Sequence, residues 1–101
     1  MKVKVIAIAT ASVLAVASVA GAAAAAASGY ISQATTSYTS PSNTTIPVDF
    51  LAQGTAVETL CFTEGQQLRN SNLWFRVARD GKTGFVHRDT IGGISGDLRH
   101  C

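Results

Sequence analysis

The fold is decided by the stretch Trp74-Phe75-Arg76-Val77-Ala78-Arg79-Asp80-Gly81-Lys82-Thr83-Gly84-Phe85-Val86-His87-Arg88-Asp89. Aromatic and β-branched residues occupy both of its arms, and such residues favour extended backbone. Asp80-Gly81 between the arms supplies the positive backbone angles that a two-residue hairpin turn requires. A second glycine, Gly84, indicates either a close approach of another backbone or a β-bulge. The stretch therefore predicts a β-hairpin.

The first 27 residues have the pattern of a secretory signal peptide. Lys2 and Lys4 form a basic start, an apolar centre follows, and residues 21–27 offer several Ala-x-Ala cleavage sites. We expect cleavage after Ala25 or Ala27. A transmembrane anchor is the alternative, because the uncharged run approaches the ~20 residues that span a bilayer. Its alanine richness and the lack of a following basic cluster favour export, with no membrane span after cleavage.

The charge of the chain also depends on this segment. The formal net charge of +2 comes from Lys2 and Lys4, since the remaining basic residues balance the acidic ones. A near-neutral chain with interleaved acids gains little from counterion release on a phosphate backbone. Nucleic acid is therefore not expected as a partner.

The two cysteines bear on stability. A mature chain of about 74 residues buries only about 60% of its unfolded surface, so extra stabilisation is expected. Cys61 and Cys101 form an even pair in an exported chain, which predicts a disulfide. The alternative is a catalytic cysteine assisted by His87 or His100, which requires a reduced thiol.

The rest of the chain is patterned for strands and loops. Residues 28–33 are expected to form a short linker, and residues 34–101 the domain with its C-terminal tail. Residues 55–62 are rich in β-branched and apolar side chains and predict a strand. A polar loop is expected over residues 64–72, and a glycine-rich tail after Ile91. With no amphipathic helix, the pattern predicts an all-β domain.

Across roughly positions 34–101 the sequence resembles the bacterial SH3-like (SH3b) family. Its motif Leu-x-x-Gly-Thr-x-Val is matched by Leu51-Ala52-Gln53-Gly54-Thr55-Ala56-Val57, and its central hairpin by Trp74-Phe75-Arg76-Val77 with Gly84-Phe85-Val86. Pro41 and Ser42 match the end of its Gly-Pro-Ser element. The cysteine positions resemble those of small secreted actinobacterial members with a single domain. The resemblance implies a small five-stranded SH3-like barrel stapled by the disulfide.

The resemblance also implies a ligand-binding groove. Its candidate residues are Trp74, His87, Thr90 and Tyr38. Trp74 would stand on the ligand surface, with His87 beside it. Thr90 replaces the second aromatic residue of the usual groove, which disfavours polyproline binding. Structural roles compete with this reading, because a domain this small needs Trp74 in its core and His87 is commonly a surface histidine.

The inventory of motifs favours binding over catalysis. The sequence has no metal-ligand spacing, glycine-rich phosphate loop or nucleophile elbow, so no catalytic residue, metal or cofactor is expected. We expect a secreted or cell-wall-associated module that recognises peptidoglycan or another extracellular peptide through the Trp74-centred groove. The alternative is a free-standing interaction domain, an effector or inhibitor, that engages a secreted or surface protein, for example by edge-strand pairing.

Overall fold

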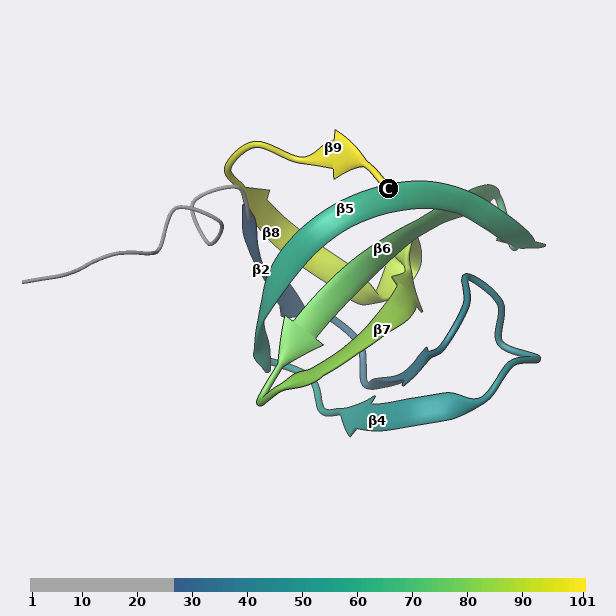
Figure 1. Ribbon diagram of the computed structural model, residues 1–101, viewed down its shortest axis with the longest axis horizontal. Helices are drawn as coiled ribbons and strands as arrows, with labels where there is room; N and C mark the ends of the chain where they lie inside the picture. The colour runs from purple at the N-terminus through teal and green to yellow at the C-terminus, as the bar shows by residue number, and fades with distance from the viewer. Residues whose placement is uncertain (1–26) are drawn as a thin grey trace, which may run out of the picture.

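The computed structural model describes residues 27–101, which form eight strands and one short 3-10 helix. The elements are β2 Ala27–Ile31, β3 Thr35–Tyr38, β4 Pro47–Leu51, β5 Ala56–Leu68, β6 Ser71–Arg79, β7 Lys82–His87, η3 Arg88–Thr90, β8 Ile91–Ser95 and β9 Arg99–His100. The strands form one sheet in the order β4-β3-β7-β6-β5-β2-β8, and β9 runs parallel to β5 (Figure 1). The predicted all-β class is confirmed.

The expectation of a five-stranded closed barrel is wrong in two respects. The described residues form eight strands, and the end strands of the sheet, β4 and β8, do not pair with each other. Segments without a strand pattern supply the additional strands. Residues 28–33, expected as a linker, begin within β2, which pairs with β5 and β8, and the glycine-rich tail supplies β8 and β9. Of the expected signal peptide, residues 1–26 lie outside the described part of the chain.

The predicted hairpin is formed by β6 and β7, which pair without a register shift. Its turn residues have positive φ values, 52° at Asp80 and 77° at Gly81, as a two-residue turn requires. Gly84 marks a close approach, because a Cβ there would lie 2.8 Å from the Ser37 side chain. The hairpin therefore packs directly against β3.

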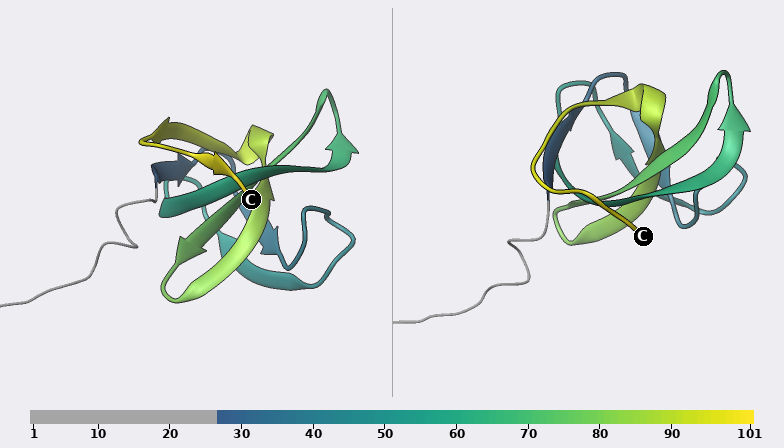
Figure 2. Two further views of the ribbon diagram at one scale, coloured as in Figure 1. Left: turned by 45° about the horizontal axis from the view of Figure 1, so that its top comes forward. Right: turned by 90° about the horizontal axis from the view of Figure 1, so that it is seen from above.

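Strand β5 is longer than predicted and changes partners along its length. It runs for 13 residues, through most of the segment expected as a polar loop, and arches over the other strands (Figure 1). Its first part pairs with both β2 and β6. Beyond Glu64 the β5–β6 pairing shifts register and continues to Leu68, which pairs with Ser71 next to the turn. The β5–β6 tip, residues 65–71, projects at the same end of the molecule as the 39–46 loop between β3 and β4 (Figure 2).

The core lies inside the curve of the sheet. Its buried side chains are Ile31, Leu51, Val57, Phe75, Val77, Val86 and Ile91. Phe75 and Val77 share one face of β6, as strand alternation predicts. Burying an aliphatic or phenyl side chain of this size contributes about 1.5–3 kcal/mol relative to leaving it exposed. The core thus draws on strands from both ends of the described chain.

The C-terminal tail is attached to β5 by a disulfide and by polar contacts. The predicted bond between Cys61 and Cys101 is confirmed and joins residues 40 positions apart. The Cys101 N–H donates to the Phe62 carbonyl oxygen at 2.8 Å. The His100 ring packs edge-on against Phe62, and its Nε2 lies 2.7 Å from Glu64 Oε1. Because both cysteines of the chain are bonded, neither is the free nucleophile of the alternative hypothesis.

The contact between His100 and Glu64 predicts that the attachment of the C-terminal tail to β5 depends on pH. The hydrogen bond to Glu64 raises the pKa of His100 above 6.5, and the same bond lowers the pKa of Glu64 below 4.5. The raised histidine pKa stabilises the folded state at low pH, and this contribution is lost as pH rises through the folded value. The lowered carboxyl pKa contributes above 4.5 and is lost as pH falls. The two opposite pKa shifts therefore widen the pH range, lying between the two groups' pKa values, over which both groups carry charge.

Glu64→Gln is expected to lower the pKa of His100, because it removes the carboxylate that stabilises the imidazolium. Following the His100 ring protons by NMR during a pH titration measures this change. Glu58→Gln is the matched control, since Glu58 is an exposed glutamate on the same strand. An unchanged His100 titration in Glu64→Gln would contradict the assigned pairing.

Candidate functional site: a pocket between two projecting loops

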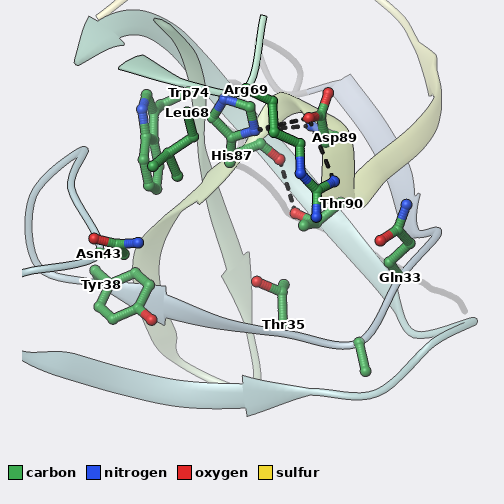
Figure 3. Close-up of a pocket in the computed structure, with 11 residues that line it drawn as sticks. Gln33, Thr35, Tyr38, Asn43, Leu68, Arg69, Trp74, His87, Asp89 and Thr90 are labelled. Carbon is green, nitrogen blue, oxygen red and sulfur yellow. Dashed lines mark hydrogen bonds and ion pairs between the residues drawn. The ribbon is translucent and has the colours of Figure 1, made fainter. Parts of the chain in front are cut away.

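A pocket of about 380 Å³ lies between the 39–46 loop, the β5–β6 tip and the end of β7. Its lining residues are Gln33, Ala34, Thr35, Tyr38, Asn43, Leu68, Arg69, Trp74, His87, Asp89 and Thr90 (Figure 3). The four residues selected from the sequence all belong to this set. The volume falls at the lower end of the roughly 300–1,000 Å³ found for small-ligand sites. The pocket is therefore of a size for a few residues of a peptide.

Trp74 forms the base of the pocket and belongs to the folded interior. The residue is 1% exposed, and its ring meets the His87 ring edge-on with centroids 5.3 Å apart. Its Nε1–H donates to the Gln66 carbonyl oxygen at 2.9 Å. The expectation that Trp74 stands on an open groove needs correction, because the indole is buried and its polar group is already paired. Trp74 supports the pocket from below.

His87 is a buried, fully hydrogen-bonded residue, so the surface-histidine reading is wrong. Its Nε2 lies 3.0 Å from the Ser71 carbonyl oxygen, and its Nδ1 accepts from the Asp89 N–H at 3.2 Å. Because Nδ1 accepts and a carbonyl can only accept, these contacts assign the ring proton to Nε2. Both ring nitrogens are thus engaged. His87 connects the β5–β6 tip to η3 and contributes a wall of the pocket.

Two hydroxyl-bearing residues face each other across the pocket. Thr90 Oγ1 donates to the His87 carbonyl oxygen at 2.7 Å, which leaves its lone pairs able to accept a further hydrogen bond. Tyr38, on the opposite wall, is half-buried and pairs with Phe85 through its backbone. Thr35 lies on the same side of the pocket as Tyr38 (Figure 3). These groups match the donors and acceptors of a peptide backbone.

The rim contains a pair of opposite charges that the sequence did not reveal. Arg69 Nη1 lies 3.8 Å from Asp89 Oδ2, and these are the arginine and the aspartate among the lining residues. Arg69 occupies the β5–β6 turn with φ 57°, a left-handed conformation that costs a non-glycine residue of order 1 kcal/mol. No sequence pattern indicated this pair. Arg69 lies in the β5–β6 turn and Asp89 in η3, so the two side chains meet only because the long β5–β6 hairpin brings its turn close to η3.

Gln66 joins the two projecting loops. Its Oε1 accepts from the Ser42 hydroxyl at 3.2 Å and from the Asn43 N–H at 2.9 Å. Its own N–H donates to the Pro41 carbonyl oxygen at 2.9 Å. A Cβ at the neighbouring Gly65 would overlap with Pro41, so only glycine allows this approach. The Pro41-Ser42 pair noted in the sequence is therefore in contact with Gly65 and Gln66.

Gln66→Ala is expected to loosen the 39–46 loop, because it leaves two donors of that loop without their acceptor. We expect a loss of about 1–2 kcal/mol in the free energy of unfolding, from two net hydrogen bonds near 1 kcal/mol each. Faster hydrogen exchange at the Asn43 amide is the direct measurement. Gln67→Ala is the matched control, and equal exchange in both variants would contradict the role of Gln66.

Other features of the described residues are weaker as sites. An open depression of about 570 Å³ lies beside the Asp80-Gly81 turn, lined by residues such as Glu58 and Arg79. Residues 27–101 contain no group of three or more His, Cys, Asp or Glu placed to hold a metal ion. Within the same range, no helix has the length and apolar character needed to cross a bilayer.

No match was found when the chain was compared with protein-family models, with curated proteins and with solved structures.

Proposed function

We propose that this protein is a secreted, non-catalytic module of SH3-like type that binds a short peptide in the pocket above Trp74. One observation carries the proposal: hydroxyl, amide and charged side chains from four separate segments of the chain line the same small pocket. Such a lining suits the regularly spaced donors and acceptors of a peptide better than an apolar small molecule. Peptidoglycan peptides are the proposed ligand, as in the bacterial family that the sequence resembles.

Several observations support binding without catalysis. Both cysteines form the disulfide, and both ring nitrogens of His87 are engaged with the backbone. The groups expected of a nucleophile and a general base are therefore committed to structure. The disulfide is also consistent with an oxidising extracellular environment, which supports secretion or association with the wall.

Co-sedimentation with protein-free cell-wall sacculi tests the proposal. The oxidised protein should bind saturably, and heat-unfolded protein should not. Asn43→Ala and Thr35→Val each remove a polar group from the pocket and should weaken binding, whereas Phe50→Ser on β4 should not. No sedimentation of the wild type, or unaltered binding of both pocket variants, would contradict a wall ligand in this pocket.

A second candidate function rests on β4. This edge strand pairs only with β3 among the described strands, and it bears Phe50 with 65% exposure next to Ile46 with 71%. An open edge with exposed apolar side chains favours a protein partner that adds a strand. Affinity capture from secreted and membrane extracts tests this function. A secreted or surface protein that is captured by the wild type and lost with Phe50→Ser would favour it, as an effector or inhibitor.

A further inference from the structure

The rim of the pocket has a charged end and an apolar end. Arg69 and Asp89 lie at one end, while Leu68 and the base formed by Trp74 lie beside each other at the other (Figure 3). Tyr38 faces the apolar end from the opposite wall. A ligand that fills the pocket therefore meets a cation at one end and an apolar surface at the other.

The Arg69 guanidinium has unused hydrogen-bonding capacity. The group carries five N–H donors, and its side chain is 72% exposed. Its ion pair with Asp89 is long, at 3.8 Å, and joins a single nitrogen to a single oxygen. Such a contact engages at most one guanidinium nitrogen and leaves the other donors available. A guanidinium in this state is suited to bidentate pairing with a second carboxylate.

The backbone conformation at Arg69 is a second indication that its side chain has a role. The turn keeps arginine at φ 57°, where glycine would be free of strain. Strain of this kind is retained most often where the side chain has a task. Asp80 has a comparable φ of 52°, but it stands in the Asp-Gly turn that explains it.

We propose that the pocket binds the free C-terminal residue of a peptide, with the α-carboxylate on Arg69 and a small apolar side chain against Leu68, which lies beside the buried Trp74. This inference rests on the proposed peptide-binding function. Asp89 offsets the charge of Arg69, so the pocket disfavours a doubly charged anion such as phosphate more strongly than a single carboxylate. The hydroxyl of Thr90 can accept from the last peptide N–H.

Binding of acetyl-alanyl-alanine and of its C-terminal amide, measured by NMR titration of the oxidised protein, tests the inference. The acid should bind about tenfold or more tightly than the amide, as expected for a charge-assisted pair. Arg69→Gln should remove this preference and leave amide binding unchanged. Arg79→Gln is the matched control, because Arg79 is an exposed arginine at the opposite end of β6.

Arg69→Gly guards against a folding artefact, since glycine tolerates the left-handed turn and should fold at least as stably. It should lose the preference for the acid as well. Equal affinities for acid and amide, no binding of either, or an acid preference that survives both Arg69 variants would overturn the inference. If sacculi binding still depends on Asn43 and Thr35 in that case, the peptide-binding function stands and only the carboxylate assignment falls.

Discussion

Trp74→Ala is expected to lower the free energy of unfolding by about 3–5 kcal/mol, the usual cost of emptying a large aromatic site. The side chain is nearly inaccessible, and its removal also leaves the Gln66 carbonyl oxygen without its donor. Chemical denaturation followed by circular dichroism measures the change. An alanine variant with the midpoint of the wild type would show that Trp74 lies outside the stable core.

Trp74→Phe separates packing from hydrogen bonding. It keeps most of the ring and loses the Nε1–H, so a smaller cost of about 1–2 kcal/mol is expected. Because either change acts on folding, loss of binding in Trp74→Ala does not by itself identify a ligand contact. Rim residues such as Asn43 and Arg69 are better probes of binding, since both are exposed.

Replacing both cysteines by serine is expected to cost about 4 kcal/mol, because opening a loop of this length restores chain entropy to the unfolded state. That loss is comparable with the whole stability of many small domains. The double variant should therefore be largely unfolded near 37 °C, as judged by thermal denaturation.

Two controls define the role of the disulfide. Wild-type protein in reductant should behave like the double serine variant, because both lack the bond between Cys61 and Cys101. His100→Gln removes the contact with Glu64 but keeps the bond, and it should stay close to the wild type. A double variant as stable as the oxidised protein would contradict a stabilising role for the bond.

The sequence predicted those parts of the fold that depend on neighbouring residues. The hairpin from β6 to β7 follows from strand alternation and from the demand of Asp80-Gly81 for positive φ. The disulfide follows from the count of cysteines. Strands β2, β8 and β9 did not emerge from the sequence. They are only two to five residues long, and their few apolar side chains are interrupted by glycine or polar residues, so they become strands only by pairing with distant partners.

The candidate site was also predicted only in part, because much of it depends on contacts between residues that are distant in the sequence. Trp74, His87, Thr90 and Tyr38 were selected by resemblance, and the structure brings them to one pocket. Their individual roles differ from expectation, since burial and hydrogen bonding depend on the β5–β6 tip. Arg69, Asp89 and Gln66 were missed as site residues. Their proximity results from the extension of β5 past the bulge after Glu64, which no local pattern indicated.

The central claim, that the pocket between the two projecting loops binds wall peptides, is tested most directly by an amide NMR titration with soluble peptide fragments of peptidoglycan. The claim predicts saturable shifts at Thr35, Tyr38, Asn43 and Arg69, and their loss in Asn43→Ala. The amides beside the Asp80-Gly81 turn should stay unchanged. Shifts confined to that turn or to β4, or no shifts at saturating peptide, would contradict the claim.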